Sequence, residues 1–365
     1  MKTRAAVLTQ VGGPLVVAEL DLAGPGEGEV LVRIEAAGVC HSDLSVVDGS
    51  RIRPLPMALG HEAAGVVVEV GAGVADIHPG DHVVLVFVPA CGVCVYCSAG
   101  TPALCERGAA ANGAGTLLRG ERRLRWEGDE VHHHLGVSAF SEHAVVDRAS
   151  IVVIDRDVPW DVAALFGCAL LTGVGAILNT ARVRPGESVA VFGLGGVGLS
   201  AVLGAALAGA YPLVAVDPVA AKRELARQLG ATHALGPADP WPTELSGGVR
   251  YAIEAVGNAA VLAAAYGATG RGGMTVAVGL PHPSAQLQIP ALSLVADAKT
   301  LTGCYLGSAA PQRDIPRLVS LWRAGRLPVE RLLTATLTLD DINDAMDRLA
   351  DGTAVRQVIR PHVRR

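Results

Sequence analysis

Apolar and polar residues alternate over short stretches in the first 150 residues of the chain. Apolar runs at residues 30–34, 65–70 and 83–88 are separated by clusters rich in Gly, Pro and Asp. Short strands bounded by such turn-forming residues are typical of all-β units. The pattern therefore predicts a β-rich, partly barrel-like domain.

After residue 159 the pattern changes to strands that alternate with helices. An apolar strand is expected at 188–192, a glycine-rich loop opens at Gly193, and an Ala-rich helix continues to about residue 210. A strand at 213–216, a helix at 222–229 and strands at 251–254 and 274–278 follow. This order predicts an α/β fold with a parallel, doubly wound sheet.

Residues 315–356 contain two amphipathic helices and a terminal strand, which we expect to return to the first domain. A chain of 365 residues exceeds what one hydrophobic core usually holds. We therefore expect three segments: a β-rich domain at 1–170, a nucleotide-binding domain at 171–305, and a return segment at 306–365 that completes the first domain.

Composition narrows the class of protein. Half of the residues are apolar, 18% are charged, and the net charge is −5, which argues against a nucleic-acid partner. The first residues lack a signal-peptide pattern, and no uninterrupted apolar run reaches membrane-spanning length. The sequence predicts a soluble, cytoplasmic protein without a membrane partner.

Four of the seven cysteines cluster at spacings of three, three and eight residues: Cys91, Cys94, Cys97 and Cys105. Four thiolates saturate a tetrahedral zinc ion, so this pattern predicts a structural zinc site. A redox Cys-x-x-Cys pair and disulfides are the alternatives. A redox pair needs neither the third nor the fourth cysteine.

Cys40, His61 and Cys168 form a second candidate set. Three widely separated Cys, His and Cys ligands leave a fourth zinc position open, which is the catalytic arrangement. Taken singly, Cys168 also fits a small buried hydrophobic residue, and His61 fits a hydrogen-bonded core histidine. Spacing alone does not bring the three together.

The glycine-rich loop reads Gly193-Leu-Gly195-Gly196-Val197-Gly198. It follows a strand and opens a helix, and Asp217 ends the next strand, as in dinucleotide-binding units. A carboxylate there binds ribose hydroxyls and repels a 2′-phosphate, so NAD is favoured over NADP. Arg223 either reaches such a phosphate or lies in solvent.

The segment Gly60-His61-Glu62-Ala-Ala-Gly65, with Gly71 and Val74, resembles the signature of zinc-containing medium-chain alcohol dehydrogenases. The resemblance extends over nearly the whole chain, and residues 105–136 are similar to the long loop of a dimeric branch. It implies a GroES-like β-rich catalytic domain, a Rossmann doubly wound domain, two zinc ions per chain and a homodimer.

The resemblance also implies roles for individual residues. Cys40, His61 and Cys168 would hold the catalytic zinc, Asp43 would orient His61, and Glu62 would lie beside the metal. Ser42 would relay the alcohol proton, with Ser45 standing where many relatives place a histidine. The implied cofactor contacts are His41, Thr172, Gly193, Gly195, Gly196, Val197, Gly198, Asp217, Lys222 and Arg356.

The resemblance places six residues around the substrate: Arg51, Phe87, His134, Leu135, Leu280 and Tyr305. Arg51 and His134 replace apolar side chains, which suggests a polar or bulkier substrate, although Arg51 equally fits a side chain pointing to water. Three consecutive histidines at 132–134 cannot all face one ion from a strand.

We therefore expect an NAD-dependent zinc alcohol dehydrogenase that transfers a hydride between a small alcohol, aldehyde or ketone and NAD(H). One alternative is a thiol-dependent formaldehyde dehydrogenase. Ala109 weakens it, because glutathione-dependent members carry an arginine at that position. The other alternative is a non-catalytic nucleotide-binding protein, which the complete set of zinc ligands argues against.

Overall fold

A computed structural model describes residues 1–363, which divide into two compact units. The first unit contains Met1–Cys168, Ala310–Ser320 and the chain from Val329 onward. The second contains Ala169–Ala309 and Leu321–Pro328. Residues 306–309 and 321–328 thus belong to the second unit, whereas the sequence pattern assigned them to the return segment.

The first unit contains a closed barrel with the strand order β1-β2-β7-β8-β4. Alternating side chains of these strands point inward and form a core that includes Val7, Leu20 and Val131. The barrel confirms the β-rich prediction for the first domain. Its strands are β1 (Lys2–Leu8), β2 (Val16–Leu22), β4 (Met57–Ala58), β7 (Leu124–Trp126) and β8 (Asp129–His133).

A seven-stranded sheet completes this unit, with the order β10-β6-β5-β3-β18-β17 and β9 also paired with β3. Gln357 of β18 pairs with Val39 of β3, so the end of the chain lies beside the strand that leads to Cys40. Its strands are β3 (Glu29–Val39), β5 (Ala63–Val70), β6 (His82–Leu85), β9 (His143–Asp147), β10 (Ile151–Ile154), β17 (Leu333–Thr338) and β18 (Arg356–Arg360).

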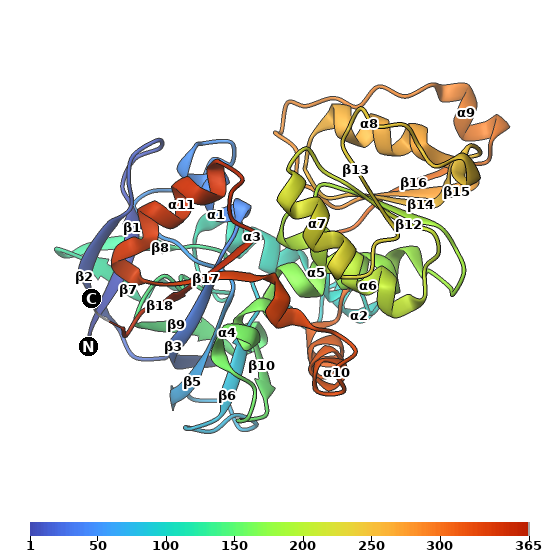
Figure 1. Cartoon of the computed structure of the whole chain (residues 1–365). Helices are drawn as coiled ribbons and strands as arrows, with labels where there is room; N and C mark the ends of the chain where they lie inside the picture. The colour runs from blue at the N-terminus through green and yellow to red at the C-terminus, as the bar shows by residue number, and fades with distance from the viewer. Residues whose placement is uncertain (364–365) are drawn as a thin grey trace. The chain divides into compact units, whose positions relative to one another are not determined.

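Short helices connect these strands, and two further helices, α10 and α11, belong to the return segment (Figure 1). The predicted amphipathic pattern of α11 is confirmed, because it buries Ile342, Ala345, Met346 and Leu349. The helices are α1 (His41–Val47), α2 (Val95–Ser98), α3 (Glu106–Ala114), α4 (Trp160–Ala163), α10 (Pro311–Arg323) and α11 (Ile342–Ala350).

The second unit is built on a parallel six-stranded sheet with the order β13-β12-β11-β14-β15-β16. Every residue of β11 and β12 is buried, as expected for a parallel sheet covered on both faces. The doubly wound prediction is confirmed. The strands are β11 (Val189–Phe192), β12 (Leu213–Val216), β13 (His233–Leu235), β14 (Val249–Glu254), β15 (Thr269–Ala277) and β16 (Thr300–Gly303).

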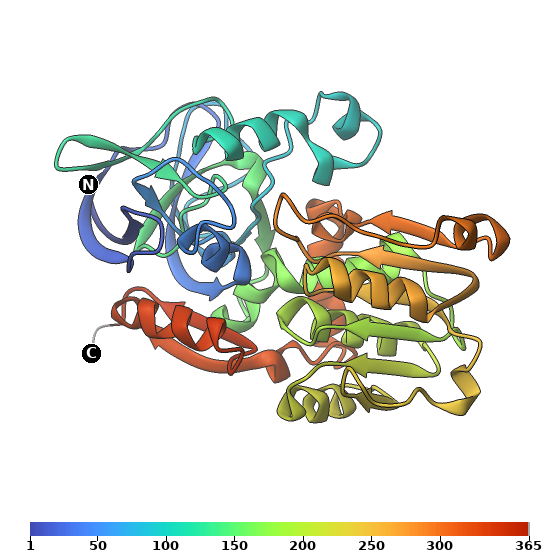
Figure 2. The same ribbon diagram turned by 90° about the horizontal axis from the view of Figure 1, so that it is seen from above.

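Helices cover both faces of this sheet. In Figure 1, α8 lies above the strands and α6 below them, and Figure 2 shows the same strands side by side from another direction. α5 packs closely against α6. The helices are α5 (Ala169–Gly175), α6 (Gly196–Ala208), α7 (Ala220–Gln228), α8 (Ala259–Ala268) and α9 (Ala291–Ala296).

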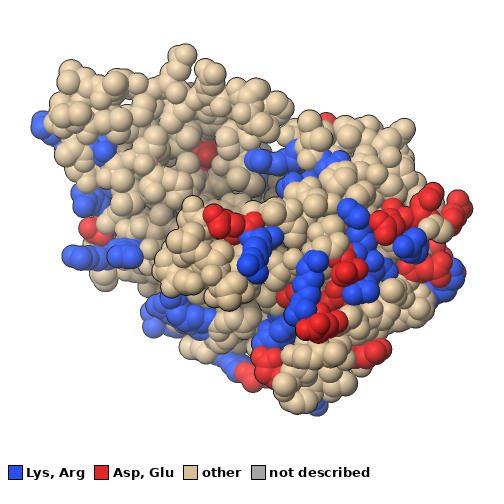
Figure 3. Space-filling view, turned by 180° about the vertical axis from the view of Figure 1, so that it is seen from behind, with Lys and Arg blue, Asp and Glu red and all other residues tan. Residues whose placement is uncertain are grey.

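Charged side chains of both signs are interspersed on the face seen in Figure 3. Within residues 1–363 no single helix is long and apolar enough to cross a membrane. One bent pair, Trp160–Gly167 with Ala169–Ala181, meets the length and composition criteria only when its two parts are counted together.

Candidate active site and metal centres

The four-cysteine lobe comprises residues 91–105. The sulfur atoms of its four cysteines lie within 4.8 Å of one another. Backbone N–H groups point at them: Cys91 N lies 3.2 Å and Gly108 N 3.3 Å from Cys105 Sγ. Backbone donors around a sulfur stabilise its thiolate form, which is the form that binds zinc.

The pKa values of the lobe thiols diverge. Backbone hydrogen bonds lower the pKa of Cys94 to about 6, whereas burial and the neighbouring thiols raise the pKa of Cys97 to about 12. Four sulfurs this close cannot all ionise unless a cation compensates their charge. Zn²⁺ satisfies this requirement, so the donor set fits a structural zinc ion.

A second group lies in the interior of the first unit. The ligand atoms of Cys40, His61, Glu62 and Cys168 lie within 4.8 Å of one another, and all four residues are buried. Cys40 follows β3, His61 and Glu62 precede β5, and Cys168 precedes α5. The fold therefore brings together the three ligands that sequence spacing alone could not connect.

The two thiols of this group shift each other's pKa in opposite directions. A hydrogen bond from Cys168, followed by the influence of His61, holds the pKa of Cys40 well below its usual range despite burial. The neighbouring Cys40 raises the pKa of Cys168 well above its usual range. A divalent cation would allow both thiols to ionise, so this donor set also fits zinc.

Asp43 fixes the orientation of His61. Its Oδ1 lies 2.9 Å from His61 Nδ1, and its Oδ2 accepts a hydrogen bond of 3.0 Å from Cys40 N. His61 Nε2 is thereby left facing the cluster, 3.5 Å from Cys168 Sγ. Burial alone would raise the pKa of Asp43, but the interactions with His61 and His134 outweigh it and hold this pKa far below its usual range.

Glu62 is tied to Arg356 in a buried ion pair. Burial raises the pKa of Glu62, while the charge of Arg356 opposes that rise. A β-carbon on residue 38 would lie 2.7 Å from Glu62 Oε1, so Gly38 leaves room for the carboxylate. The resemblance implied separate roles for Glu62 and Arg356, at the metal and at the cofactor, and did not predict their pairing.

The residues predicted for proton relay and for the pyrophosphate lie on α1. Ser42 Oγ is 3.9 Å from Cys40 Sγ, beside the second metal group. Ser45 Oγ donates a 2.8 Å hydrogen bond to the backbone oxygen of His41, its own helix neighbour. The hydroxyl proton of Ser45 is therefore already engaged within the helix.

Predicted pocket residues lie in both units. Phe87 and His134 are buried and meet the ring of His61 edge to face, with centroid distances of 5.4 Å and 5.3 Å. Leu135 is also buried, whereas Arg51 is partly exposed. Leu280 and Tyr305 belong to the second unit, where their exposed fractions are 51% and 38%, and their part in a shared pocket stays a prediction.

The glycine-rich loop joins β11 to α6. Gly193 has a φ of 88°, which favours glycine, and α6 begins at Gly196. Val197 lies in the first turn of α6, Thr172 is buried in α5, and Lys222 is partly exposed on α7. The loop and the helix N-terminus thus have the arrangement that dinucleotide binding requires.

Asp217 lies directly behind this loop. Its Oδ2 accepts a hydrogen bond of 2.8 Å from Leu194 N, and its Oδ1 accepts one of 2.8 Å from Val219 N. Arg223 donates to the backbone oxygens of Asp217 and Pro218, so its guanidinium is anchored to the backbone beside this strand end. The carboxylate therefore supports the glycine-rich loop.

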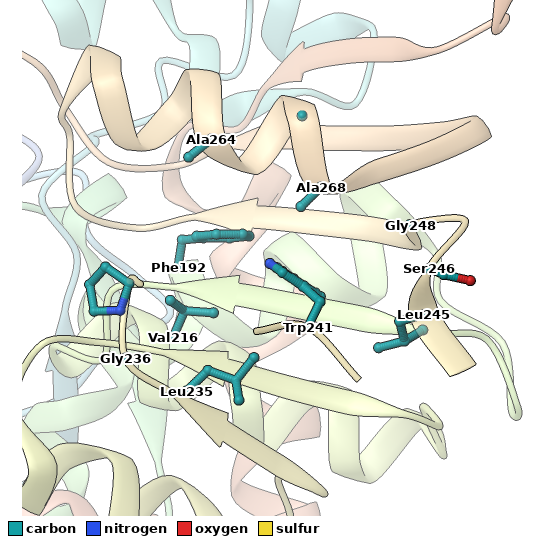
Figure 4. A pocket seen from close by; sticks show the side chains of 12 residues that line it. Phe192, Val216, Leu235, Gly236, Trp241, Leu245, Ser246, Gly248, Ala264 and Ala268 are labelled. Carbon is teal, nitrogen blue, oxygen red and sulfur yellow. The ribbon is translucent and has the colours of Figure 1, made fainter. Parts of the chain in front are cut away.

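The sequence did not predict the apolar pocket next to Asp217 (Figure 4). This pocket of about 370 Å³ is lined by the last residues of three strands, Phe192, Val216 and Leu235, and by Trp241. The apolar strand ends were visible in the sequence. Trp241 stands in an irregular segment without periodicity, so nothing in the pattern assigned it to the sheet face.

Comparison with known proteins agrees with both units. Residues 26–156 match the alcohol dehydrogenase GroES-like domain, and residues 196–323 match the zinc-binding dehydrogenase domain. The chain is 40% identical to the S-(hydroxymethyl)glutathione dehydrogenase of Synechocystis sp., over 98% of this chain and 100% of that protein. It is 41% identical to the NDMA-dependent alcohol dehydrogenase of Amycolatopsis methanolica, over 98% of this chain and 99% of that protein.

Comparison with solved structures agrees with these sequence matches. An alcohol dehydrogenase zinc-binding domain protein from Burkholderia ambifaria superposes with a TM-score of 0.94 at 36% identity, covering 99% of this chain and 100% of that one. Benzyl alcohol dehydrogenase from Acinetobacter calcoaceticus gives 0.93 at 34% identity, covering 99% of both chains. The predictions of family, fold class and two zinc-ligand groups are confirmed. The chain belongs to the zinc-containing medium-chain alcohol dehydrogenases, a family of oxidoreductases that act on alcohol groups.

Proposed function

We propose that the chain interconverts a small alcohol and its aldehyde or ketone with NAD(H), at the group formed by Cys40, His61 and Cys168. One observation carries the proposal: three buried ligands face one another while Arg356 holds the fourth member, Glu62, in an ion pair. A zinc ion with three protein ligands keeps a position for substrate. When bound, zinc supplies a Lewis acid and NAD supplies the hydride acceptor.

The residues of this chain then have distinct tasks. Asp43 keeps the proton of His61 on Nδ1, so that Nε2 is available as a ligand. Ser42, which lies beside Cys40, accepts the proton of the substrate hydroxyl. Because the hydroxyl of Ser45 donates to His41 O, we assign the next proton transfer to water rather than to Ser45.

The cofactor proposal rests on the second unit. Asp217 presents a carboxylate at the end of β12, where it would accept hydrogen bonds from ribose hydroxyls and repel a 2′-phosphate. The adjacent pocket with the aromatic side chains of Phe192 and Trp241 suits the flat, aromatic adenine ring. Both features support NAD as the cofactor.

The test combines metal analysis with turnover. We expect two zinc ions per chain by atomic spectrometry, and a change in NADH absorbance when primary, secondary, aromatic and amino alcohols or their carbonyls are screened. The Cys40→Ser variant should lose one zinc and turnover, while Cys97→Ser should lose the other zinc. Turnover that persists in Cys40→Ser would contradict the assignment of the catalytic group.

A thiol-dependent formaldehyde dehydrogenase is the second candidate. It is favoured by the 40% identity to the S-(hydroxymethyl)glutathione dehydrogenase of Synechocystis sp.. Ala109 opposes it, since this small side chain offers no charge for a thiol adduct. Formaldehyde oxidation measured with and without added glutathione separates the two, because only the second candidate requires the thiol.

We further propose a cytoplasmic homodimer. In the described chain β16 pairs only with β15, which leaves one edge of the parallel sheet open. The nearby helix α9 exposes 76% of Leu292 and 82% of Val295, and exposed apolar side chains of this size commonly mark an interface. Light scattering coupled to size exclusion would measure the mass, and a monomeric mass would contradict the dimer.

A further inference from the structure

We propose that His134 is a positioning residue that shares the carboxylate of Asp43 with His61 and so fixes the metal-binding histidine. The inference rests on the proposed role of His61 as a zinc ligand. It differs from the sequence expectation, in which His134 only lined the substrate pocket.

Both histidines approach the same oxygen atom of Asp43. Asp43 Oδ1 lies 2.9 Å from His61 Nδ1 and 3.2 Å from His134 Nδ1. Its second oxygen, Oδ2, accepts a hydrogen bond from Cys40 N. An ionised carboxylate only accepts hydrogen bonds, so both Nδ1 atoms carry protons. His61 Nε2 faces the cysteines and would be the nitrogen that holds a bound zinc ion.

The contact of His134 Nδ1 with Asp43 Oδ1 is close but lacks the alignment of a full hydrogen bond. Within the described residues, Nδ1 of His134 has no hydrogen-bond partner, and the exposed fraction of the residue is 1%. A buried donor without a partner is unfavourable, and Asp43 is the acceptor within reach. Burial and this acceptor together favour the orientation of His134 towards the carboxylate.

Backbone contacts and a tight turn fix the position of His134. His134 follows β8, and its N–H donates to Ser138 Oγ at 3.0 Å and lies 3.3 Å from the backbone oxygen of Ala58. The φ values of Leu135 and Ser138 are 52° and 53°, in the left-handed region that side chains rarely adopt. Two such residues in one turn are a local strain, and strain of this kind concentrates at functional sites.

His61 is restrained on three sides. The ring of His134 meets it edge to face at an interplanar angle of 85°, and the ring of Phe87 does so at 87°. Asp43 occupies the third direction, at Nδ1. These contacts leave the imidazole little freedom to rotate away from Cys40 and Cys168, which is the property that a metal ligand held by outer partners should have.

The experiment measures zinc retention in the full-length holoenzyme. His134→Phe keeps a ring and removes the donor, whereas His134→Asn keeps a side-chain N–H close to the position of Nδ1. His132→Phe is the matched control, because His132 lies two residues earlier, on β8, and its Nδ1 accepts a hydrogen bond from Arg122 instead. Zinc transfer to a chromophoric chelator is followed over time, and Cys97→Ser identifies the phase that belongs to the lobe.

We expect His134→Phe to lose the second zinc about tenfold faster than the wild type, with the lobe zinc leaving at an unchanged rate. His134→Asn should restore slow release, and His132→Phe should behave like the wild type. If His134→Phe fails to fold, His134→Met provides a donor-free side chain of similar volume.

Unchanged zinc release in His134→Phe would overturn the inference. So would release from His134→Asn as fast as from His134→Phe, because shape rather than the donor would then matter. A wild-type protein that retains only the lobe zinc would instead overturn the proposed function of the Cys40 group, and this outcome is visible before any variant is made.

Discussion

A β-carbon added at residue 198 would stand 1.7 Å from the carbonyl oxygen of Gly193. The first residue of the glycine-rich loop thus closes directly against the helix that follows it. Gly195, between them, has no atom within 4 Å of such a β-carbon. The fold therefore requires a glycine at position 198 but leaves room for a side chain at position 195, where the proposed cofactor supplies the reason for a glycine.

Gly198→Ala should destabilise the protein, because the loop backbone must move to admit the methyl group. We expect a loss of about 2 kcal/mol in the free energy of unfolding and weak NAD binding. Gly195→Ala should unfold like the wild type but bind NAD less tightly, because the methyl group obstructs approach of the pyrophosphate. Urea unfolding measures the stability of each variant, and calorimetric titration measures its affinity for NAD. Equal free energies of unfolding for the two variants would contradict the different roles assigned to Gly195 and Gly198.

Asp217→Gly should raise the use of NADP relative to NAD. Removal of the carboxylate ends the repulsion of a 2′-phosphate, and Arg223 is anchored beside the same strand end. NAD binding should weaken as well, since Asp217 also supports Leu194 of the loop. The ratio of kcat/KM values for NADP and NAD is the measurement, and an unchanged ratio would refute the assignment.

The buried charge of Arg356 should destabilise the fold when Glu62 is neutralised. Both side chains are buried, so Glu62→Gln leaves a guanidinium without a counterion. We expect a loss of about 3 kcal/mol in the free energy of unfolding. The double variant Glu62→Gln with Arg356→Met should recover part of it, and a double variant less stable than the single one would show that the pair is not the cause.

His133 should make the protein sensitive to mild acid. Burial lowers the pKa of His133 to about 3, while the unfolded chain takes up this proton near pH 6.5. The unfolded state therefore binds more protons between these values, so the free energy of unfolding falls as the pH drops. From pH 7 to pH 5 the loss due to this residue is about 2 kcal/mol.

His133→Gln tests this pH dependence. Glutamine keeps an acceptor for Arg123 N, which donates to His133 Nε2 in the wild type, but it cannot be protonated. Urea unfolding of the wild type and the variant at pH 7 and pH 5 gives the stability that each protein loses on acidification. Comparing these two losses cancels the effect of acid on the other groups. A variant that loses as much stability as the wild type would exclude His133 as the source.

Metal ligands that lie close together in the sequence can be predicted from their spacing, whereas ligands from distant segments cannot. The lobe cysteines lie within one short segment, and their spacing and number together predicted the metal group. Cys40, His61 and Cys168 are brought together only by strand pairing between distant segments, so the family resemblance was needed to connect them. The contact between His134 and Asp43 has no sequence signal, because it depends on a turn at the end of β8.

The return segment shows the same limit. The pattern predicted its two helices and terminal strand, but not β17 (Leu333–Thr338), an edge strand in which no residue is fully buried. The strand expected at 83–88 ends at Leu85, since the chain then leaves the sheet towards Pro89 and the lobe. Arg356 reaches Glu62 only because β18 pairs with β3, a pairing that periodicity does not encode.

Cys105 has two partners of different kinds. Its sulfur belongs to the lobe group, and it also accepts the hydrogen bond of Gly108 N that begins α3. One turn further along, Asn112 donates to the backbone oxygen of Phe87, the residue whose ring faces His61. Chelation of the lobe metal would thus leave the charge of the Cys105 sulfur, the cap of α3, without compensation, while Asn112 of the same helix supports the residue that packs on His61. One helix therefore connects the lobe group with the surroundings of His61.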